Sequence, residues 1–313
     1  MKLSAEQKER VEELLAQMTL EEKIGQMNLE SPSIVGGFDV PFEELIEMMT
    51  DGRLSKEEFQ KIMSTAQRDY HEDDIRAGMV GAMMADDPRK NNELQKIAVE
   101  ESRLGIPMLT GFDVIHGLRT VYPIAIAEAG TFDPELFERT AHLAARESRA
   151  HGINWNFAPM IDVARDSRWG RVSEGPGEDP YLGSTFARAK IRGLQSDTSD
   201  TADYVAACLK HYVAYGACES GRDYNTTDMS RQRMYNEYFA PYKAAVDAGV
   251  GSVMASFNEV DGIPATANRW LMTEVLRNQW GFGGLVVTDY TGIAEMIEHG
   301  IGDMQEVSAR ALQ

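Results

Sequence analysis

Strongly polar side chains follow three apolar segments of strand length in this chain of 313 residues. They are Asp113 after 106–112, Lys210 and His211 after 204–209, and Asp289 and Tyr290 after 284–288. Polar groups buried there without partners would cost several kcal/mol, and each taken alone is equally well interpreted as a salt bridge or loop cap. Because functional residues of a parallel barrel gather at the carboxyl ends of its strands, we expect one shared site. A carboxylate or a lysine amine in it can act as a nucleophile.

Two loops are further candidates. The loop 165–179 carries Trp169 beside Arg168 and Arg171, together with carboxylates and three glycines. This composition predicts a rigid polar wall that stacks on and hydrogen-bonds a sugar or another polyhydroxylated ligand, although a solvated, salt-bridged loop is the alternative. The short loop 221–225 follows Lys210 and His211 in the sequence, and a plain turn explains it equally well.

No metal site or cofactor is predicted. The acidic run 71–74 contains metal-ligand types, but a solvated turn is the simpler interpretation, and His116 is equally well explained as a core histidine. The two cysteines, Cys208 and Cys218, are too few for a disulfide framework or a zinc site built on sulfur. They are expected to be free thiols.

Short apolar segments alternate with longer segments of helical period, which predicts a parallel sheet covered on both faces. The predicted strands are 79–85, 106–112, 153–157, 204–209, 251–257 and 284–288. Their spacing suits an eight-fold barrel, with a seventh strand expected in 161–165 or near Thr227. An open doubly wound sheet is the alternative, but the glycine-rich dinucleotide fingerprint after the first strand is absent.

Charge and hydropathy limit the partners. The chain has 50 acidic and 31 basic side chains, a net charge of −19, which disfavours nucleic acid and anionic membranes and is compatible with a neutral substrate. No apolar run approaches the roughly 18 residues of a membrane helix. The start of the chain is charged and lacks the apolar core of a secretion signal. We therefore expect a cytoplasmic protein, or a periplasmic or secreted one if a signal was removed.

Four segments together resemble the signature segments of glycoside hydrolase family 3. They are GIPMLTGFDVIHGLRTVYPI, RDSRWGRVSEGPGEDPYLGS, LKHYVAYG followed by GRDYN, and GLVVTDY. They occur in the family's order, and the resemblance extends from about Met18 to the last residue. It is greatest to the multidomain bacterial β-glucosidases. The resemblance implies a barrel of the triosephosphate isomerase (TIM) type and a retaining, exo-acting β-glycosidase that releases terminal non-reducing β-D-glucosyl residues.

The resemblance also implies roles for individual residues. Asp289 matches the nucleophile that forms the covalent glycosyl-enzyme. The residues that match sugar-binding positions are Asp113, Arg171, Lys210 and His211. Phe257 stands where tyrosine is frequent, Tyr290 where tryptophan or histidine is frequent, and Ser167 where proline is usual. These departures concern the pocket wall and leave the nucleophile in place.

The expected organisation is an N-terminal helical segment, 1–65, that packs on a barrel domain, 66–313, whose last strand is missing from the chain. In the glucosidase branch of the family the acid/base glutamate belongs to a downstream α/β domain. In the single-domain branch, which acts on N-acetylglucosaminides, it lies on a loop with the pattern KHFPGHG, whereas this chain has KHYVAYG at 210–216. We therefore expect a fragment of a longer enzyme, with no acid/base residue on this chain.

Two other functions stay open. A barrel lyase or aldolase would use Lys210 as a Schiff-base amine and would need a lysine of depressed pKa in a dry site. A non-catalytic, carbohydrate-binding fragment is the other alternative, and the presence of Asp289 speaks against it.

Overall fold

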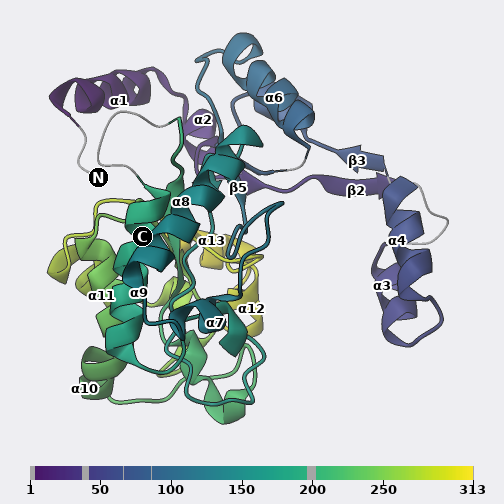
Figure 1. Cartoon of the computed structure of the whole chain (residues 1–313). Coiled ribbons are helices and arrows are strands. Elements are labelled where there is room, and N and C mark those ends of the chain that lie inside the picture. The colour runs from purple at the N-terminus through teal and green to yellow at the C-terminus, as the bar shows by residue number, and fades with distance from the viewer. Residues whose placement is uncertain (1–3, 37–41, 66, 86, 196–201, 313) are drawn as a thin grey trace. The chain divides into compact units, whose positions relative to one another are not determined.

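The structure is a computed structural model that describes residues 4–36, 42–65, 67–85, 87–195 and 202–312 (Figure 1). The chain divides into two compact units. The first runs up to Thr110, and the second begins at Gly111. Each unit has its own buried apolar core.

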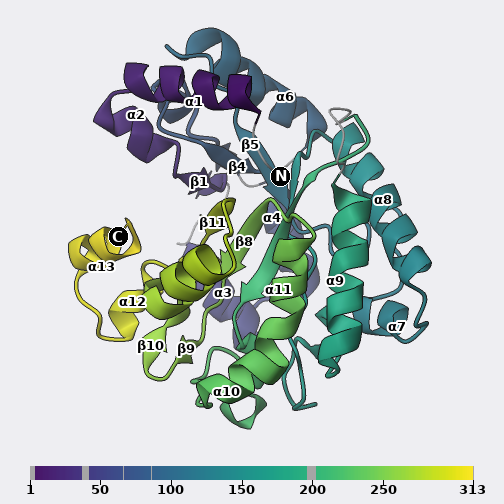
Figure 2. The ribbon, with the colours of Figure 1, turned by 90° about the vertical axis from the view of Figure 1, so that its left-hand side faces the viewer.

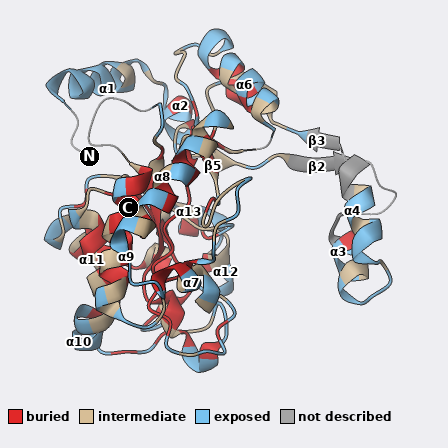
Figure 3. Ribbon diagram, viewed as in Figure 1, coloured by how far each residue is buried: buried red, intermediate tan, exposed pale blue. Residues whose placement is uncertain are grey.

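The first unit consists of short helices and four strands. The helices are α1 (Ala5–Gln17), α2 (Leu20–Gly25), α3 (Phe42–Thr50), α4 (Lys56–Thr65), α5 (Glu72–Arg76) and α6 (Pro88–Lys96), which continues as a π-helix over Ile97–Glu101. The strands are β1 (Leu29–Glu30), β2 (Ser33–Gly36), β3 (Gln67–Asp69) and β4 (Ala82–Met84). β1 pairs with β4 in parallel and β2 with β3 antiparallel. Helix α1 buries none of its residues and is coloured as exposed along its length in Figure 3.

A parallel sheet organises the second unit. Its strands are β5 (Leu109–Phe112), which begins in the first unit, β6 (Trp155–Asn156), β7 (Ala206–Tyr212), β8 (Ser252–Ala255) and β11 (Leu285–Val287). They are neighbours in that order, and each pair is parallel. The short strands β9 (Glu259–Val260) and β10 (Ile263–Pro264) form a separate antiparallel hairpin.

The helices of the second unit lie between these parallel strands, as parallel pairing requires, except for the last two, which follow β11. They are α7 (Ala125–Ala129), α8 (Pro134–Ala150), α9 (Pro180–Leu194), α10 (Arg231–Arg233), α11 (Phe239–Asp247), a π-helix over Trp270–Gln279, α12 (Glu295–Glu298) and α13 (Met304–Leu312). α8, α9 and α11 lie side by side and cover one face of the sheet (Figure 2). Asp133 begins α8 by accepting hydrogen bonds from the backbone N–H groups of Glu135 and Leu136. The core under these helices includes Phe186, which is almost fully buried.

The alternation of parallel strands and helices confirms the predicted TIM-type barrel class. Each of the six predicted strands overlaps an observed one, and β7 extends three residues beyond its predicted end. The predicted place of the seventh strand was wrong, because 161–165 holds no strand and Thr227 forms only an isolated bridge to Val260. The seventh strand is β1, which is too short to carry a recognisable period. Within the described residues the sheet thus has seven strands, and these residues form no eighth strand of the sheet.

The N-terminal 65 residues contain β1 and β2 besides four helices. The predicted domain boundary falls at residue 66, which lies outside the described residues, and the division of the chain into 1–65 and 66–313 stays a prediction. None of the helices described is both long and apolar enough to cross a membrane. Cys208 and Cys218 are free, buried thiols, as expected, and burial raises the pKa of each to about 12.

Candidate active site

The carboxyl ends of β5, β7 and β11 bring the predicted residues together. Asp113 directly follows β5, and Asp289 comes two residues after β11. Strand β7 continues beyond its predicted end to Tyr212, so Lys210 and His211 are the two residues before its last one. The Lys210 ammonium forms an ion pair with the Asp113 carboxylate, and His211 Nε2 lies 3.4 Å from Asp289 Oδ2. Residues from three strand ends that were expected to share one site therefore form two contacting pairs through the adjacent residues Lys210 and His211.

Arg171 joins this cluster from the loop after β6. Its guanidinium makes a bidentate ion pair with Glu174, at 2.7 Å and 2.8 Å, and its Nη2 lies 3.0 Å from His211 Nε2. Burial alone would raise the pKa of Glu174, but Arg171 lowers it, so the carboxylate stays ionised at neutral pH. The fork geometry of this pair fixes the guanidinium plane beside the imidazole.

The protonation of His211 follows from its neighbours. The imidazole is fully buried, and burial lowers its pKa, so it is neutral at pH 7. Arg171 can only donate, and His211 Nε2 must therefore accept from it. The proton then sits on Nδ1 and is donated to Asp162 Oδ2 at 2.9 Å. Asp162 thus selects the tautomer whose Nε2 lone pair faces Arg171.

Asp162 is itself fully buried and held from two further directions. Its Oδ2 also accepts the backbone N–H of His211 at 3.0 Å, and its Oδ1 lies 2.7 Å from the hydroxyl of Tyr242 on α11. These hydrogen bonds fix the position of the carboxylate beside the imidazole. Asp162 could not be predicted from the sequence, because the residues before it form only an isolated bridge, between Met160 and Lys210, and no regular strand.

Lys210 and Asp289 differ in accessibility. Lys210 is 4% exposed and Asp289 keeps 18% of its side chain exposed, while its Oδ1 accepts the backbone N–H of Tyr290 at 2.7 Å. The ion pair with Asp113 occupies the Lys210 amine, and this disfavours the alternative of a Schiff-base lysine. A carboxylate at a strand end, partly open and next to the His211 imidazole, is instead suited to attack a neutral electrophile.

The aromatic residues occupy three different environments. Phe257 is only 8% exposed, whereas Tyr290, beside Asp289, is 77% exposed. Trp169 is 2% exposed, and its indole N–H donates to Asp223 at 2.8 Å. The expectation that Trp169 offers a face to a ligand was therefore wrong, since packing turns this side chain into the core while Arg168 remains at the surface beside Asp166.

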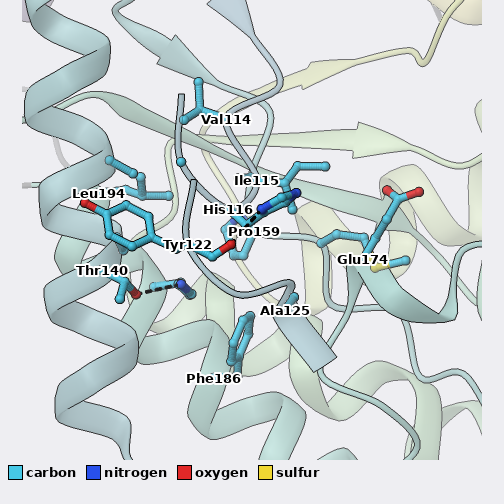
Figure 4. Close-up of a pocket in the computed structure, with 16 residues that line it drawn as sticks. Val114, Ile115, His116, Tyr122, Ala125, Thr140, Pro159, Glu174, Phe186 and Leu194 are labelled. Atoms are coloured by element: carbon cyan, nitrogen blue, oxygen red, sulfur yellow. Dashed lines mark hydrogen bonds between the residues drawn. The ribbon is translucent and has the colours of Figure 1, made fainter. Parts of the chain in front are cut away.

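A cavity lies behind the site, lined by the loop after β5 and by α8 and α9 (Figure 4). Glu174 forms part of its wall, as do Tyr122 and His116. His116 Nδ1 lies 3.0 Å from the Tyr122 carbonyl, and the Tyr122 N–H donates to the His116 carbonyl. His116 therefore stabilises the loop between these two residues. In the parts of the chain that the structure describes, no group of three or more His, Cys, Asp or Glu side chains could hold a metal ion.

The model of the glycosyl hydrolase family 3 N-terminal domain matches residues 19–313. The chain belongs to this family. This family 3 chain is 40% identical over 300 residues to the periplasmic β-glucosidase of Salmonella typhimurium, covering 96% of the chain and 35% of the Salmonella protein. It is 39% identical over 233 residues to a β-xylosidase of Formosa agariphila, covering 70% of the chain and 32% of that protein.

The crystal structure of a β-glucosidase from Listeria innocua has the same fold as the family 3 chain. The two superpose with a TM-score of 0.81 at 37% identity, over 97% of this chain and 40% of the Listeria chain. The complex of that enzyme with glucose gives a TM-score of 0.80 at 36% identity, over 99% of this chain and 41% of the other. The chain thus spans about a third to two fifths of the length of these relatives.

Proposed function

We propose that the protein is a retaining β-glycosidase of the β-glucosidase type, which releases terminal non-reducing β-D-glucosyl residues. The observation that carries the proposal is the partly open Asp289 carboxylate next to buried His211, with the Arg171–Glu174 and Lys210–Asp113 pairs at the same strand ends. Membership of family 3 and relatives named as β-glucosidases support it.

In this proposal Asp289 is the nucleophile. Its carboxylate attacks the anomeric carbon, a glycosyl ester forms, and the bond to the leaving-group oxygen breaks as that oxygen takes a proton from a carboxylic acid. Water then attacks the same carbon and gives its proton to the same group, which now acts as base, while the ester bond breaks and releases the Asp289 carboxylate. We propose that this acid/base residue comes from a part of the protein outside this chain, in a downstream α/β domain.

The sugar-binding residues would be Asp113, Arg171, Lys210 and His211. A ring of charged donors and acceptors can bind hydroxyl groups by charge-assisted hydrogen bonds and hold the anomeric carbon in line with Asp289. Phe257 and Tyr290 are proposed to border the pocket. The substrate class is a β-glucoside or a small β-linked oligosaccharide, and no nucleic acid or membrane partner is proposed.

We expect a hexose rather than a pentose at the terminal site. Asp113 keeps 47% of its side chain exposed. Its carboxylate can accept a hydrogen bond from the hydroxyl furthest from the anomeric carbon, and a xyloside lacks this contact. An unpaired polar group of this kind costs about 1–3 kcal/mol. The measurement compares kcat/KM on an aryl β-glucoside and an aryl β-xyloside, and a clear preference for the xyloside would refute the expectation.

The carboxylate behind the imidazole gives a second prediction. Asp162→Asn keeps the shape but removes the charge that favours the Nδ1–H tautomer of His211. We expect kcat/KM on an aryl β-glucoside to fall about 10- to 100-fold, because misplaced binding groups have effects of this size. The thermal midpoint should change by only a few degrees, since Tyr242 can turn its hydroxyl proton to the His211 carbonyl, 2.6 Å away.

A matched control for this variant is Asp303→Asn. Asp303 accepts the N–H of Glu306 at the start of α13, and asparagine serves as a helix N-cap equally well. Full activity in Asp303→Asn together with full activity in Asp162→Asn would show that His211 needs no charged partner at Nδ1.

The compartment stays a prediction. We propose a periplasmic or secreted location if the natural protein carries a signal, and a cytoplasmic one otherwise. The name of the Salmonella relative includes the word periplasmic.

A further inference from the structure

A series of aromatic rings runs outward from the site. The buried Tyr215 ring packs against Trp169, His211 and Phe257, with ring centroids 5.3, 5.2 and 5.9 Å apart. The guanidinium carbon of Arg171 lies 5.5 Å from the centre of the Tyr215 ring. The Tyr215 ring thus packs against both His211 and Arg171.

Tyr224 ends this series at the surface. Its ring lies on that of Phe257 with centroids 4.4 Å apart and planes inclined by 37°, and its distance to the Tyr215 ring is 6.3 Å. Phe257 is 8% exposed under this cover, whereas Tyr224 is 48% exposed. A ligand would therefore contact the Tyr224 ring here, and Phe257 supports that ring from the buried side.

The backbone holds Tyr224 in place. Its φ of 64° is left-handed, a conformation that is uncommon for a bulky residue and is retained only where the surroundings enforce it. The Asn225 N–H donates to the Arg222 carbonyl at 3.2 Å, and the Asn225 side chain donates to the Glu219 carbonyl at 3.0 Å. Asp223, the preceding residue, accepts the indole N–H of Trp169. The turn therefore presents the Tyr224 ring in a fixed orientation.

Ring contacts connect Tyr224 to the proposed nucleophile, because the Tyr215 ring lies against both Tyr224 and His211, and His211 Nε2 is 3.4 Å from Asp289 Oδ2. Burial raises the pKa of the Tyr224 phenol, and the carboxylates of Glu295 and Asp289 raise it further. The residues suited to bind sugar hydroxyls are more deeply buried than Tyr224, since Lys210 is 4% exposed and His211 is fully buried. When the terminal sugar of a substrate binds to those buried groups, the leaving group of the substrate would lie in the more open space beside Tyr224.

We propose that Tyr224 is an aromatic binding surface for the leaving group of the substrate, the group bonded to the glycosidic oxygen. The proposal rests on the proposed function. The ligand class is an aryl group or a second sugar ring, each of which has an apolar face that packs on an aromatic ring. Tyr224 is accordingly a specificity-determining residue, and the loop 221–225 is more than a plain turn.

The experiment uses the full-length gene product and three substrates that share the glucosyl group: an aryl β-glucoside, a β-linked diglucoside and methyl β-glucoside. Tyr224→Asn removes the ring but keeps a residue that tolerates the left-handed conformation. We expect its kcat/KM to fall roughly tenfold on the first two substrates, the size of one aromatic contact, and to stay within about twofold on the methyl glucoside. Tyr224→Phe should match the wild type on all three.

Tyr181→Asn is the matched control, since Tyr181 is 80% exposed at the start of α9, and it should leave all three values unchanged. An equal loss on all three substrates in Tyr224→Asn, or no loss on any, overturns the proposal. A wild type that is active but whose substrate ratios do not change in Tyr224→Asn overturns this inference alone. A wild type that hydrolyses none of the three overturns the proposed function and this inference together.

Discussion

Asp289→Asn in the full-length protein is expected to lower kcat on an aryl β-glucoside by roughly 10⁴-fold while the sugar still binds. The carboxylate is the group proposed to form the covalent intermediate, and an amide oxygen is too weak a nucleophile to replace it. The residues proposed to bind the sugar stay in place, because Arg171 is held by Glu174 and Lys210 by Asp113. Binding of glucose, measured by calorimetry, should therefore change little.

Asp261→Asn is the control for this variant. Asp261 is an exposed turn residue with φ of 53°, which asparagine adopts readily, so activity should not change. Activity of Asp289→Asn within about tenfold of the wild type would exclude Asp289 as the nucleophile.

Asp289→Gly separates a nucleophile from a residue that only supports the site. The smaller side chain leaves room for azide, which would attack the anomeric carbon from the face that Asp289 used, displace the leaving group and yield an α-glycosyl azide. We also expect a mechanism-based fluoro-sugar to label the peptide that contains Asp289 in the wild type. Recovery of the β-azide, or a label on another peptide, would contradict the assignment.

Lys190→Met is expected to have the largest effect on stability. Lys190 on α9 and Glu128 on α7 form an ion pair at 2.6 Å in which the side chains are 7% and 3% exposed, and Lys190 also donates to Thr140 on α8 at 3.0 Å. Burial lowers the pKa of Lys190, and Glu128 opposes this effect. Removing one member of such a pair leaves a buried charge without its partner, which costs about 3–5 kcal/mol in the free energy of unfolding.

The double variant Lys190→Met, Glu128→Leu should recover most of that loss, because no charge is then left in the core. Thr140 keeps partners in both variants, since its hydroxyl lies 3.1 Å from the carbonyl oxygens of Leu136 and Phe137. The measurement is chemical unfolding of the three proteins followed by circular dichroism.

Lys243→Met supplies the comparison for an exposed lysine. Lys243 pairs with Asp247 one turn along α11, with 40% and 59% of the two side chains exposed, and such pairs contribute little to stability. A double variant as unstable as Lys190→Met would mean that the cost arises from packing and not from the unpaired carboxylate.

Local patterns in the sequence determined the class of fold and the centre of the candidate site. Apolar segments of strand length separated by helical segments predicted the parallel sheet, and all six predicted strands overlap an observed strand. Asp113, Lys210, His211 and Asp289 could be named because each stands next to or within an apolar segment, and parallel strands must bring such ends together. These inferences need only neighbours in the sequence.

Other features were decided by contacts between distant parts of the chain. The sequence order does not indicate that Asp162 lies against His211, 49 residues away, or that Lys190 is paired with Glu128, 62 residues away. A carboxylate is equally plausible at the surface or in the core, and its burial depends on whether donors from other helices and strands reach it. The same holds for β1, whose two residues became part of the sheet by pairing with β4.

The tertiary structure likewise decided whether aromatic side chains point into the core or to the surface. The sequence placed Trp169 in a polar loop and favoured an exposed stacking surface, but its ring packs on Tyr215 and is buried. Tyr224, in a segment that a plain turn explained equally well, lies on Phe257 and keeps half of its surface exposed. Periodicity and spacing therefore determined which residues stand at the strand ends. Packing alone decided which rings face inward, because burying an aromatic ring requires a partner surface that only the folded chain supplies.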